Sequence, residues 1–295
     1  MTAAAAAVPA AFAAAAARGV LADSTLFVAP SRRRLREAAL AAAALVLGRD
    51  DPASHPDFVL LDPEALGVDG LRVEHVAHRK DGVPSLEDAL RYRPRLGGRR
   101  VAVLLDADLM LADAQGALLK TAEEPPPGTH LVLTATDPSA LLPALRSRCR
   151  LLRLPPLDPE TARGRLAALG LTEEEAALLT RAVGSAEAVE DLADDERAFL
   201  LERAPACARW LAGADPEAGW LAADEAPGRL AEQRRRAILL LQAALGWSLA
   251  ARPDRPPAEV DPLLEALGDL RGNVTPTLVL GRLRRRLIQT GVRSV

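Results

Sequence analysis

The chain has 295 residues, of which 49% are hydrophobic and only 3% aromatic, and its formal net charge is -3. This length predicts two or three domains, and the slightly acidic balance excludes a protein that binds nucleic acid over its whole surface. With so few aromatic residues the cores must consist of Leu, Ala and Val, which favours helices. No run approaches the roughly 20 apolar residues of a membrane helix, and the alanine-rich start lacks the basic leader of a signal peptide. We therefore expect a soluble protein with no membrane association.

The two cysteines, Cys149 and Cys207, have neither the number for a disulfide framework nor the spacing of a zinc site. The four histidines also lack metal-ligand spacing. We therefore expect a reduced, cytoplasmic setting and no bound metal.

The first half of the chain alternates short apolar runs with helical patterns. In chain order, the sequence predicts a helix over 10–18, a strand over 26–28, a helix over 32–47, a strand over 58–61, helices over 71–77 and 85–93, a strand over 101–105, a helix over 112–123, a strand over 130–134, a helix over 140–145 and a strand over 151–154. Gly48 is a natural C-cap and Ser85 an N-cap. Alternation at this spacing predicts a parallel αβ sheet.

After Pro155 the strand pattern ends. The segment 159–191 predicts two or three short helices, and only long helices are expected from about Ala198 onward. The expected division is an αβ domain over 1–155, a small helical domain over 156–198 and a helical C-terminal domain over 199–295.

The turn after the first strand is where a parallel αβ domain would bind phosphate. Here it reads Val28-Ala-Pro-Ser-Arg-Arg-Arg-Leu35, which has no glycine, no lysine and too few residues between strand and helix. The strand over 101–105 is followed by Asp106, but Ala107 stands where a catalytic acid would be. We infer that the chain does not hydrolyse ATP by itself, and we expect Asp106 to cap the next element.

Three segments carry a specific family resemblance: Val101 to Asp108, Ala117 to Pro126, and Leu142 to Cys149. The run Ala-Leu-Leu-Lys-Thr-Ala-Glu-Glu-Pro-Pro with a downstream Ser-Arg-Cys resembles the clamp loader subunits of bacterial DNA polymerase III. His55-Pro-Asp57 and Gly184-Ser-Ala186 are also similar to that family. The resemblance covers roughly residues 10 to 200. It implies a RecA-like AAA+ αβ domain, a small helical lid and a helical collar domain that joins the subunits.

The departures from the family pattern point to its delta-prime branch, because the Gly-Lys-Thr loop and the Asp-Glu pair of the ATPase subunits are both missing. The corresponding positions Ser31, Asp106 and Thr136 are degenerate, so the resemblance implies that no cofactor is bound by this chain. ATP and magnesium would be held by neighbouring subunits. Family members often carry four cysteines before the His-Pro-Asp turn; this chain has none there, so no zinc module is expected.

The resemblance also assigns a role to Arg148 as an arginine finger that acts in trans on a neighbour's ATP. Ser147 and Cys149 would hold the turn that carries it, with Cys149 a small buried side chain rather than a reactive thiol. A structural ion pair is the alternative role for Arg148. Lys120, Glu123 and Glu124 are expected to fix the end of their helix and the proline turn after it, by ion pairing and capping.

The implied partners are the gamma/tau ATPase and delta subunits, the sliding clamp through the complex, and primed DNA, reached directly or indirectly. The arginines of 91–100 are candidates for contact with DNA phosphates, although a solvated loop explains them equally well. Two other functions stay open at this stage. One is an ATP-binding subunit of the gamma/tau type, and the other is a helical adaptor whose αβ domain has decayed.

Overall fold

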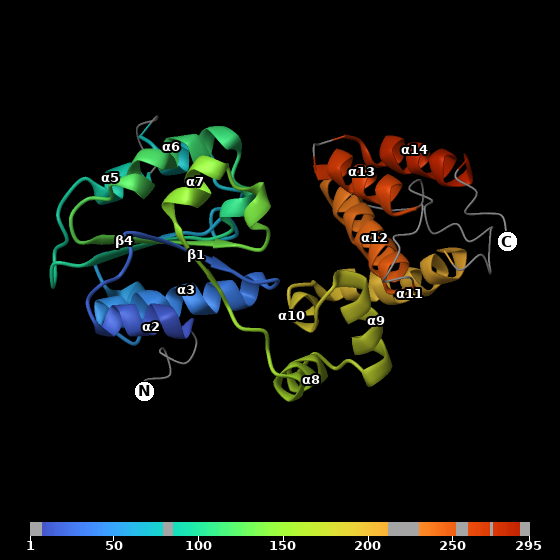
Figure 1. The fold of residues 1–295 in the computed structure, drawn as a ribbon, viewed down its shortest axis with the longest axis horizontal. Coiled ribbons are helices and arrows are strands. Elements are labelled where there is room, and N and C mark those ends of the chain that lie inside the picture. Colours follow the sequence, from blue (N-terminus) through green and yellow to red (C-terminus); the bar gives the residue numbers. More distant parts are fainter. Residues whose placement is uncertain (1–7, 79–84, 212–229, 252–258, 272–273, 290–295) are drawn as a thin grey trace. The chain divides into compact units, whose positions relative to one another are not determined.

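The computed structural model describes residues 8–78, 85–211, 230–251, 259–271 and 274–289 (Figure 1). The chain divides into two compact units, Met1–Pro156 and Leu157–Val295. The first unit contains the sheet, and the regular elements of the second unit are all helices in the residues that the structure describes.

The sheet of the first unit has five parallel strands in the order β2-β3-β4-β1-β5. The strands are β1 (Ser24–Val28), β2 (Phe58–Leu61), β3 (Arg100–Leu104), β4 (Thr129–Ala135) and β5 (Arg150–Arg153). Every residue of β1 and β3 is buried, as expected for strands covered on both faces. The RecA-like parallel sheet predicted from the sequence is therefore confirmed. Among the described residues β5 pairs with β1 alone, and three of its four residues are exposed.

Helices cover both faces of this sheet (Figure 1). Alternate strand residues point to opposite faces, so Phe27 packs in a cluster with the helices α2 and α3, whereas Leu26 packs with α6 and α7 on the other face. The helices of this unit are α2 (Ala10–Ala17), α3 (Arg32–Leu47), α4 (Val73–Val76), α5 (Leu86–Leu90), α6 (Ala112–Glu123) and α7 (Pro143–Arg148).

Local capping explains why several predicted elements are found where the sequence places them. Ser31 accepts a hydrogen bond from the N–H of Arg34 at the start of α3, and Gly48 ends that helix with a φ of 65°. Ser85 accepts from the N–H of Asp88 at the start of α5. The predicted bounds of α3, α6 and β2 agree with the structure.

Three helix predictions were wrong in extent. The segment 71–77 forms a helix only over Val73–Val76, and 85–93 only over Leu86–Leu90. The helix expected over 140–145 lies at Pro143–Arg148 instead, after a 3₁₀ turn η3 (Pro138–Ala140). Pro143 explains this shift, because its fixed φ suits the first turn of a helix and its missing N–H costs nothing there.

The second unit is made of α8 (Pro159–Ala168), α9 (Glu173–Val183), α10 (Ala186–Val189), α11 (Asp194–Leu211), α12 (Leu230–Ala251), α13 (Val260–Arg271) and α14 (Pro276–Gln289). One apolar cluster contains Leu179 of α9 and Leu200 of α11, and another contains Leu263 of α13 and Leu283 of α14. Helix α12 supplies residues to both clusters. The division of this unit into a lid and a collar stays a prediction.

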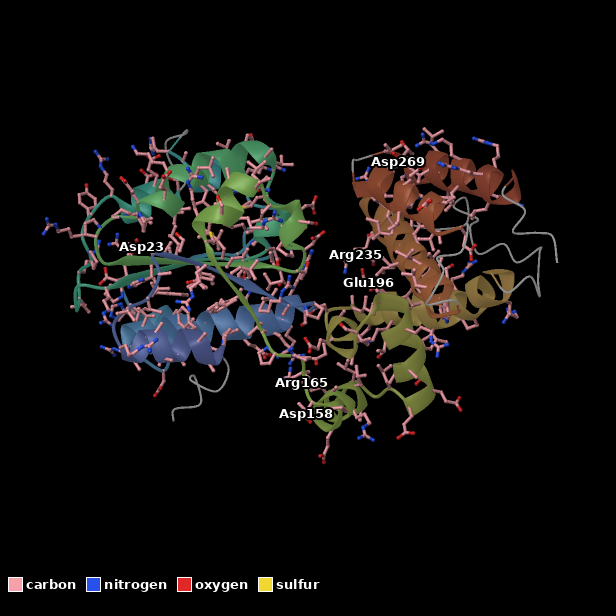
Figure 2. The ribbon with its side chains drawn as sticks, viewed as in Figure 1. Asp23, Asp158, Arg165, Glu196, Arg235 and Asp269 are labelled. Atoms are coloured by element: carbon pink, nitrogen blue, oxygen red, sulfur yellow. The ribbon has the colours of Figure 1, made fainter. Side chains whose placement is uncertain are left out.

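An ion pair adds to the packing of α11 on α12. Arg235 donates to both carboxylate oxygens of Glu196, which is nearly buried, and both side chains are labelled in Figure 2. Within the described parts of the chain, no helix has the length and apolarity needed to cross a bilayer.

Candidate functional site

In the turn between β1 and α3, where a phosphate-binding loop would lie, polar groups form hydrogen bonds within the chain. Only Ala29, Pro30 and Ser31 separate the strand from the helix. The side chain of Ser31 is fully buried, and its Oγ accepts the N–H of Arg34 at 3.2 Å. Arg34 in turn donates from Nη2 to the carbonyl of Pro155 at 2.8 Å. An N–H group that could hold a phosphate in a working loop is thus already bonded within the chain.

Asp106 follows the buried strand β3 in a left-handed conformation with a φ of 53°. Its N–H donates to Thr134 Oγ1 at 2.9 Å, and its Oδ1 lies 3.7 Å from Nε of Arg32, the first residue of α3. The side chain does not cap the 3₁₀ turn η2 (Ala107–Leu109) that follows, so the expected capping role was wrong. The reason is that the cation at the start of α3 lies close enough to compete for the carboxylate.

Thr136 lies after β4, beside the carboxyl end of β3, and its hydroxyl donates to Oδ2 of Asp108 at 2.7 Å. The same oxygen accepts the N–H groups of Thr136 and Asp137, each at 3.0 Å. Ser31, Asp106 and Thr136 therefore all have internal partners. In the described residues no group of three His, Cys, Asp or Glu side chains is arranged to hold a metal ion.

Arg148 is the last residue of α7 and lies close to the end of α6. Its Nε donates to Oε2 of Glu123 at 2.9 Å, and its Nη1 donates to the carbonyl of Ala144 at 2.9 Å. The Arg148 side chain is 33% exposed and that of Glu123 is 57% exposed. A guanidinium has five N–H donors, and no further partner for those of Arg148 occurs among the described residues. The Arg148 guanidinium can therefore bind a further anion while its helix stays folded.

The residues around Arg148 hold its helix in place. Leu145 is fully buried and Cys149 is 8% exposed, and both belong to the apolar cluster beneath α6 and α7. Burial raises the pKa of the Cys149 thiol to about 11, so the group is protonated and unreactive near neutral pH. Ser147 is exposed, and its Oγ donates to the carbonyl of Ala144 at 3.0 Å within its own helix.

The pairing of Glu123 with Arg148 was not foreseen from the sequence, because 25 positions separate the two residues. Both stand in segments that resemble the same family, which was the only available signal. Asp108 was also missed as the side chain that holds the turn after β4. It is the second acid after a buried strand, a pattern that fits many roles.

A sequence model described as "DNA polymerase III, delta subunit" matches residues 6–158, which is more than half of the chain. The chain belongs to this family. Relatives within the delta' branch include the DNA polymerase III subunit delta' of Escherichia coli, which is 41% identical over 107 residues, and that of Bacillus subtilis, which is 30% identical over 149 residues. The recognition of this branch from the sequence is therefore confirmed.

The matches are partial on both sides. The Escherichia coli match covers 35% of this chain and 28% of that protein, and the Bacillus subtilis match covers 50% and 42%. The DNA polymerase III subunit tau of Escherichia coli is also similar, with 32% identity over 117 residues, or 39% of this chain and 18% of that protein. The chain thus spans less than half the length of the delta' relatives it matches.

The fold agrees with a solved structure over nearly its whole length. A DNA polymerase III gamma subunit-related protein from Thermotoga maritima superposes with a TM-score of 0.51, covering 96% of this chain and 98% of that one. The sequence identity is 17%, so the match concerns the fold alone.

Proposed function

We propose that this chain is a non-hydrolysing delta'-type subunit of a replicative clamp loader and that it supplies Arg148 in trans to ATP on a neighbouring subunit. Its partners are ATPase subunits of the gamma/tau type and a delta subunit. The assembled loader acts in the cytoplasm and places a sliding clamp on primed DNA. The proposal rests on the family and on the position of Arg148.

The first support is the state of the nucleotide site in this chain. A triphosphate bound in this turn would have to separate Arg32 from Asp106. It would also have to compete with Ser31 Oγ, which already accepts the N–H of Arg34. No lysine is present in this turn to reach the phosphates. ATP and magnesium therefore belong on a neighbour, and this chain contributes through its surface.

The second support is the geometry of Arg148. Leu145 and Cys149 anchor one side of α7 in the core, while the guanidinium lies at the surface with N–H donors that bind no other residue in the described part of the chain. Guanidinium groups bind phosphate oxygens in a planar, bidentate manner and keep their charge at any physiological pH. In related phosphoryl transfer such a group increases the rate by about 10³–10⁵.

Glu123 is suited to hold the guanidinium before a nucleotide is present. An exposed ion pair of this kind contributes only about 0–1 kcal/mol, so a γ-phosphate with more negative charge can replace the carboxylate. The pair thus keeps the side chain ordered without preventing its transfer to a neighbour's ATP.

The test is ATP hydrolysis by the reconstituted loader in the presence of clamp and primed DNA. Arg148→Ala should abolish most of the turnover while leaving assembly, followed by gel filtration, unchanged. Arg148→Lys should restore little, because an ammonium cannot bind two oxygens in one plane. Arg146→Ala is the matched control: it is exposed on the same helix, and its loss should not affect turnover.

Two results would contradict the proposal. Unchanged turnover in Arg148→Ala would make this residue a structural ion-pair partner. If even the wild type failed to join the ATPase subunits, the chain would be a helical adaptor rather than a loader subunit.

A second candidate is an ATP-binding subunit of the gamma/tau type, which the 32% identity to subunit tau favours. It requires phosphate binding at Val28 to Leu35 in spite of the internal bonds there. Titration of the isolated chain with fluorescent ATP separates the two. Tight binding that Arg32→Ala weakens would support this candidate, whereas the delta' proposal expects no binding.

A further inference from the structure

The loop between α5 and β3, residues 91–99, has a concentration of positive charge that the proposed function does not use. It contains four arginines, Arg91, Arg93, Arg95 and Arg99, and no acidic residue, and all four are exposed. Among the residues that the structure describes, none of the four forms an ion pair with an acid. Like charges at this density repel one another, and a bound polyanion would remove that repulsion.

A buried carboxylate holds this loop in one conformation. Asp57 is fully buried, and its two oxygens accept the N–H groups of Arg95 and Leu96, each at 2.7 Å. Burial alone would raise the pKa of Asp57, but the bonds from these N–H groups and from Arg100 outweigh it and hold the pKa below its ordinary value. The Asp57 carboxylate is therefore charged at neutral pH, and it binds the backbone of the loop from the buried side.

The guanidinium of Arg100 completes the support. It is buried, pairs with Asp57 at 3.4 Å and donates to the carbonyls of Tyr92 at 2.8 Å and Arg93 at 3.3 Å. The backbone returns through Gly97 and Gly98, which have φ of 67° and 69°. A Cβ atom at position 128 would lie 2.3 Å from the carbonyl oxygen of Gly98, so this close approach of the two segments requires Gly128. The loop is thus preorganised, and its backbone polar groups near Asp57 and Arg100 are directed inward.

What remains at the surface is suited to a nucleic acid. The four guanidinium groups can bind phosphates, and the ring of Tyr92, which is 72% exposed, can stack on a base. The chain as a whole has a net charge of -3, so a polyanion is not attracted to its whole surface and binds only where arginines are concentrated, as they are in this loop. An acidic protein surface would pair with the arginines, but it offers no nucleobase to stack on the ring of Tyr92.

We propose that the loop 91–99 is a nucleic-acid contact that binds the phosphate backbone of a single strand through its arginines, with Tyr92 stacking on a base. The loop lies at the amino ends of β2, β3 and β4, whereas Asp106 and Thr136 follow the carboxyl ends of β3 and β4. The contact is therefore separate from the turn that corresponds to a nucleotide site. It deepens the proposed function by placing a direct DNA contact in this chain, and it does not depend on the role of Arg148.

The test uses the full chain and a fluorescein-labelled thymidine oligonucleotide of about 20 nucleotides, with binding followed by anisotropy over a series of salt concentrations. The triple variant Arg91→Ala/Arg93→Ala/Arg95→Ala should bind at least about tenfold more weakly at low salt. Its slope of log K against log salt should be smaller by about 2, since each phosphate contact contributes about 0.7 on a single strand. Tyr92→Ala should weaken binding with no change of slope, and Tyr92→Phe should bind as the wild type does.

The matched control removes the same charge elsewhere. Arg49, Arg284 and Arg285 are exposed and lie outside the loop, so the triple variant Arg49→Ala/Arg284→Ala/Arg285→Ala should keep the wild-type slope. Circular dichroism checks that both variants fold. Arg148→Ala should also bind the oligonucleotide normally, so a loss of ATP turnover in that variant and a loss of DNA binding in the loop variant report on different proposals.

Three results would overturn the inference. Wild-type protein could fail to bind the oligonucleotide at low salt. The control variant could lose as much affinity and slope as the loop variant, which would indicate a diffuse charge effect. A labelled poly-glutamate peptide could bind the loop more tightly than the oligonucleotide does, which would indicate an acidic protein partner instead.

Discussion

Two arginines of the first unit, Arg100 and Arg148, each pair with a carboxylate near the amino end of a strand, yet they differ in burial. Arg100 begins the central strand β3, its side chain is 5% exposed, and its partner Asp57 is fully buried. Arg148 lies just before the edge strand β5, and its side chain and that of Glu123 are both partly exposed. The same pairing chemistry thus anchors a loop in one place and leaves an exchangeable cation in the other.

The position of each strand in the sheet accounts for the difference. Strand β3 lies between β2 and β4, so a charge at its start is surrounded by protein and must be fully compensated. In the described part of the chain β5 has a neighbouring strand on one side only, so water reaches the residues before it. Where a charge is buried, removal of its partner strongly lowers the free energy of unfolding. Where the charge is exposed, another anion can replace the partner.

The largest effect is expected at the buried pair. Asp57→Ala leaves Arg100 without its counter-charge and the N–H groups of Arg95 and Leu96 without an acceptor, and it should lower the free energy of unfolding by about 3–5 kcal/mol. Urea denaturation measures this loss. Asp50→Ala, at an exposed position nearby, should change it by less than about 0.5 kcal/mol. A loss below about 1 kcal/mol for Asp57→Ala would show that the pair does not anchor the loop.

An intermediate effect is expected at Cys149, which follows the exposed Arg148 but is itself buried. Its pKa of about 11 exceeds the ordinary 9.0, so the folded protein binds the thiol proton more tightly than the unfolded chain does. The resulting stability is fully present below about pH 9 and is lost as the pH rises toward about 11. The expected loss is on the order of 2–3 kcal/mol.

Cys149→Ala serves as the reference for this loss, since all other alkaline titrations are common to both proteins. The difference in unfolding free energy between wild type and variant should be constant up to about pH 9 and should shrink above it. A difference independent of pH throughout this range would mean that water reaches the thiol in the folded state.

The smallest effect is expected at the exposed pair. A double-mutant cycle with Arg148→Ala and Glu123→Ala should give a coupling free energy of at most about 1 kcal/mol in urea denaturation. This is consistent with a side chain that is free to move to a phosphate. A coupling of about 3 kcal/mol, close to the value expected for the buried pair, would assign Arg148 a structural role.

The sequence by itself determined the elements whose boundaries are set locally. Ser31 and Gly48 define the two ends of α3 through capping and a left-handed φ, and the continuous apolar run of β3 indicated a strand buried on both faces. The motif Ser147-Arg-Cys149, with its neighbours, was enough to indicate the family, because a resemblance of this kind depends on residue order and not on the arrangement in space.

Only the tertiary structure decided how distant charges are paired. That Asp106 pairs with Arg32 rather than capping η2, that Glu123 pairs with Arg148, and that Asp57 holds a loop 38 positions away all depend on which strands become neighbours. It also decided that the carbonyls of Tyr92 and Arg93, just beyond the end of α5 at Leu90, accept hydrogen bonds from the side chain of Arg100. Local preferences contain no information about such contacts, since charges distant in the chain compete for the same partners only once the sheet has formed.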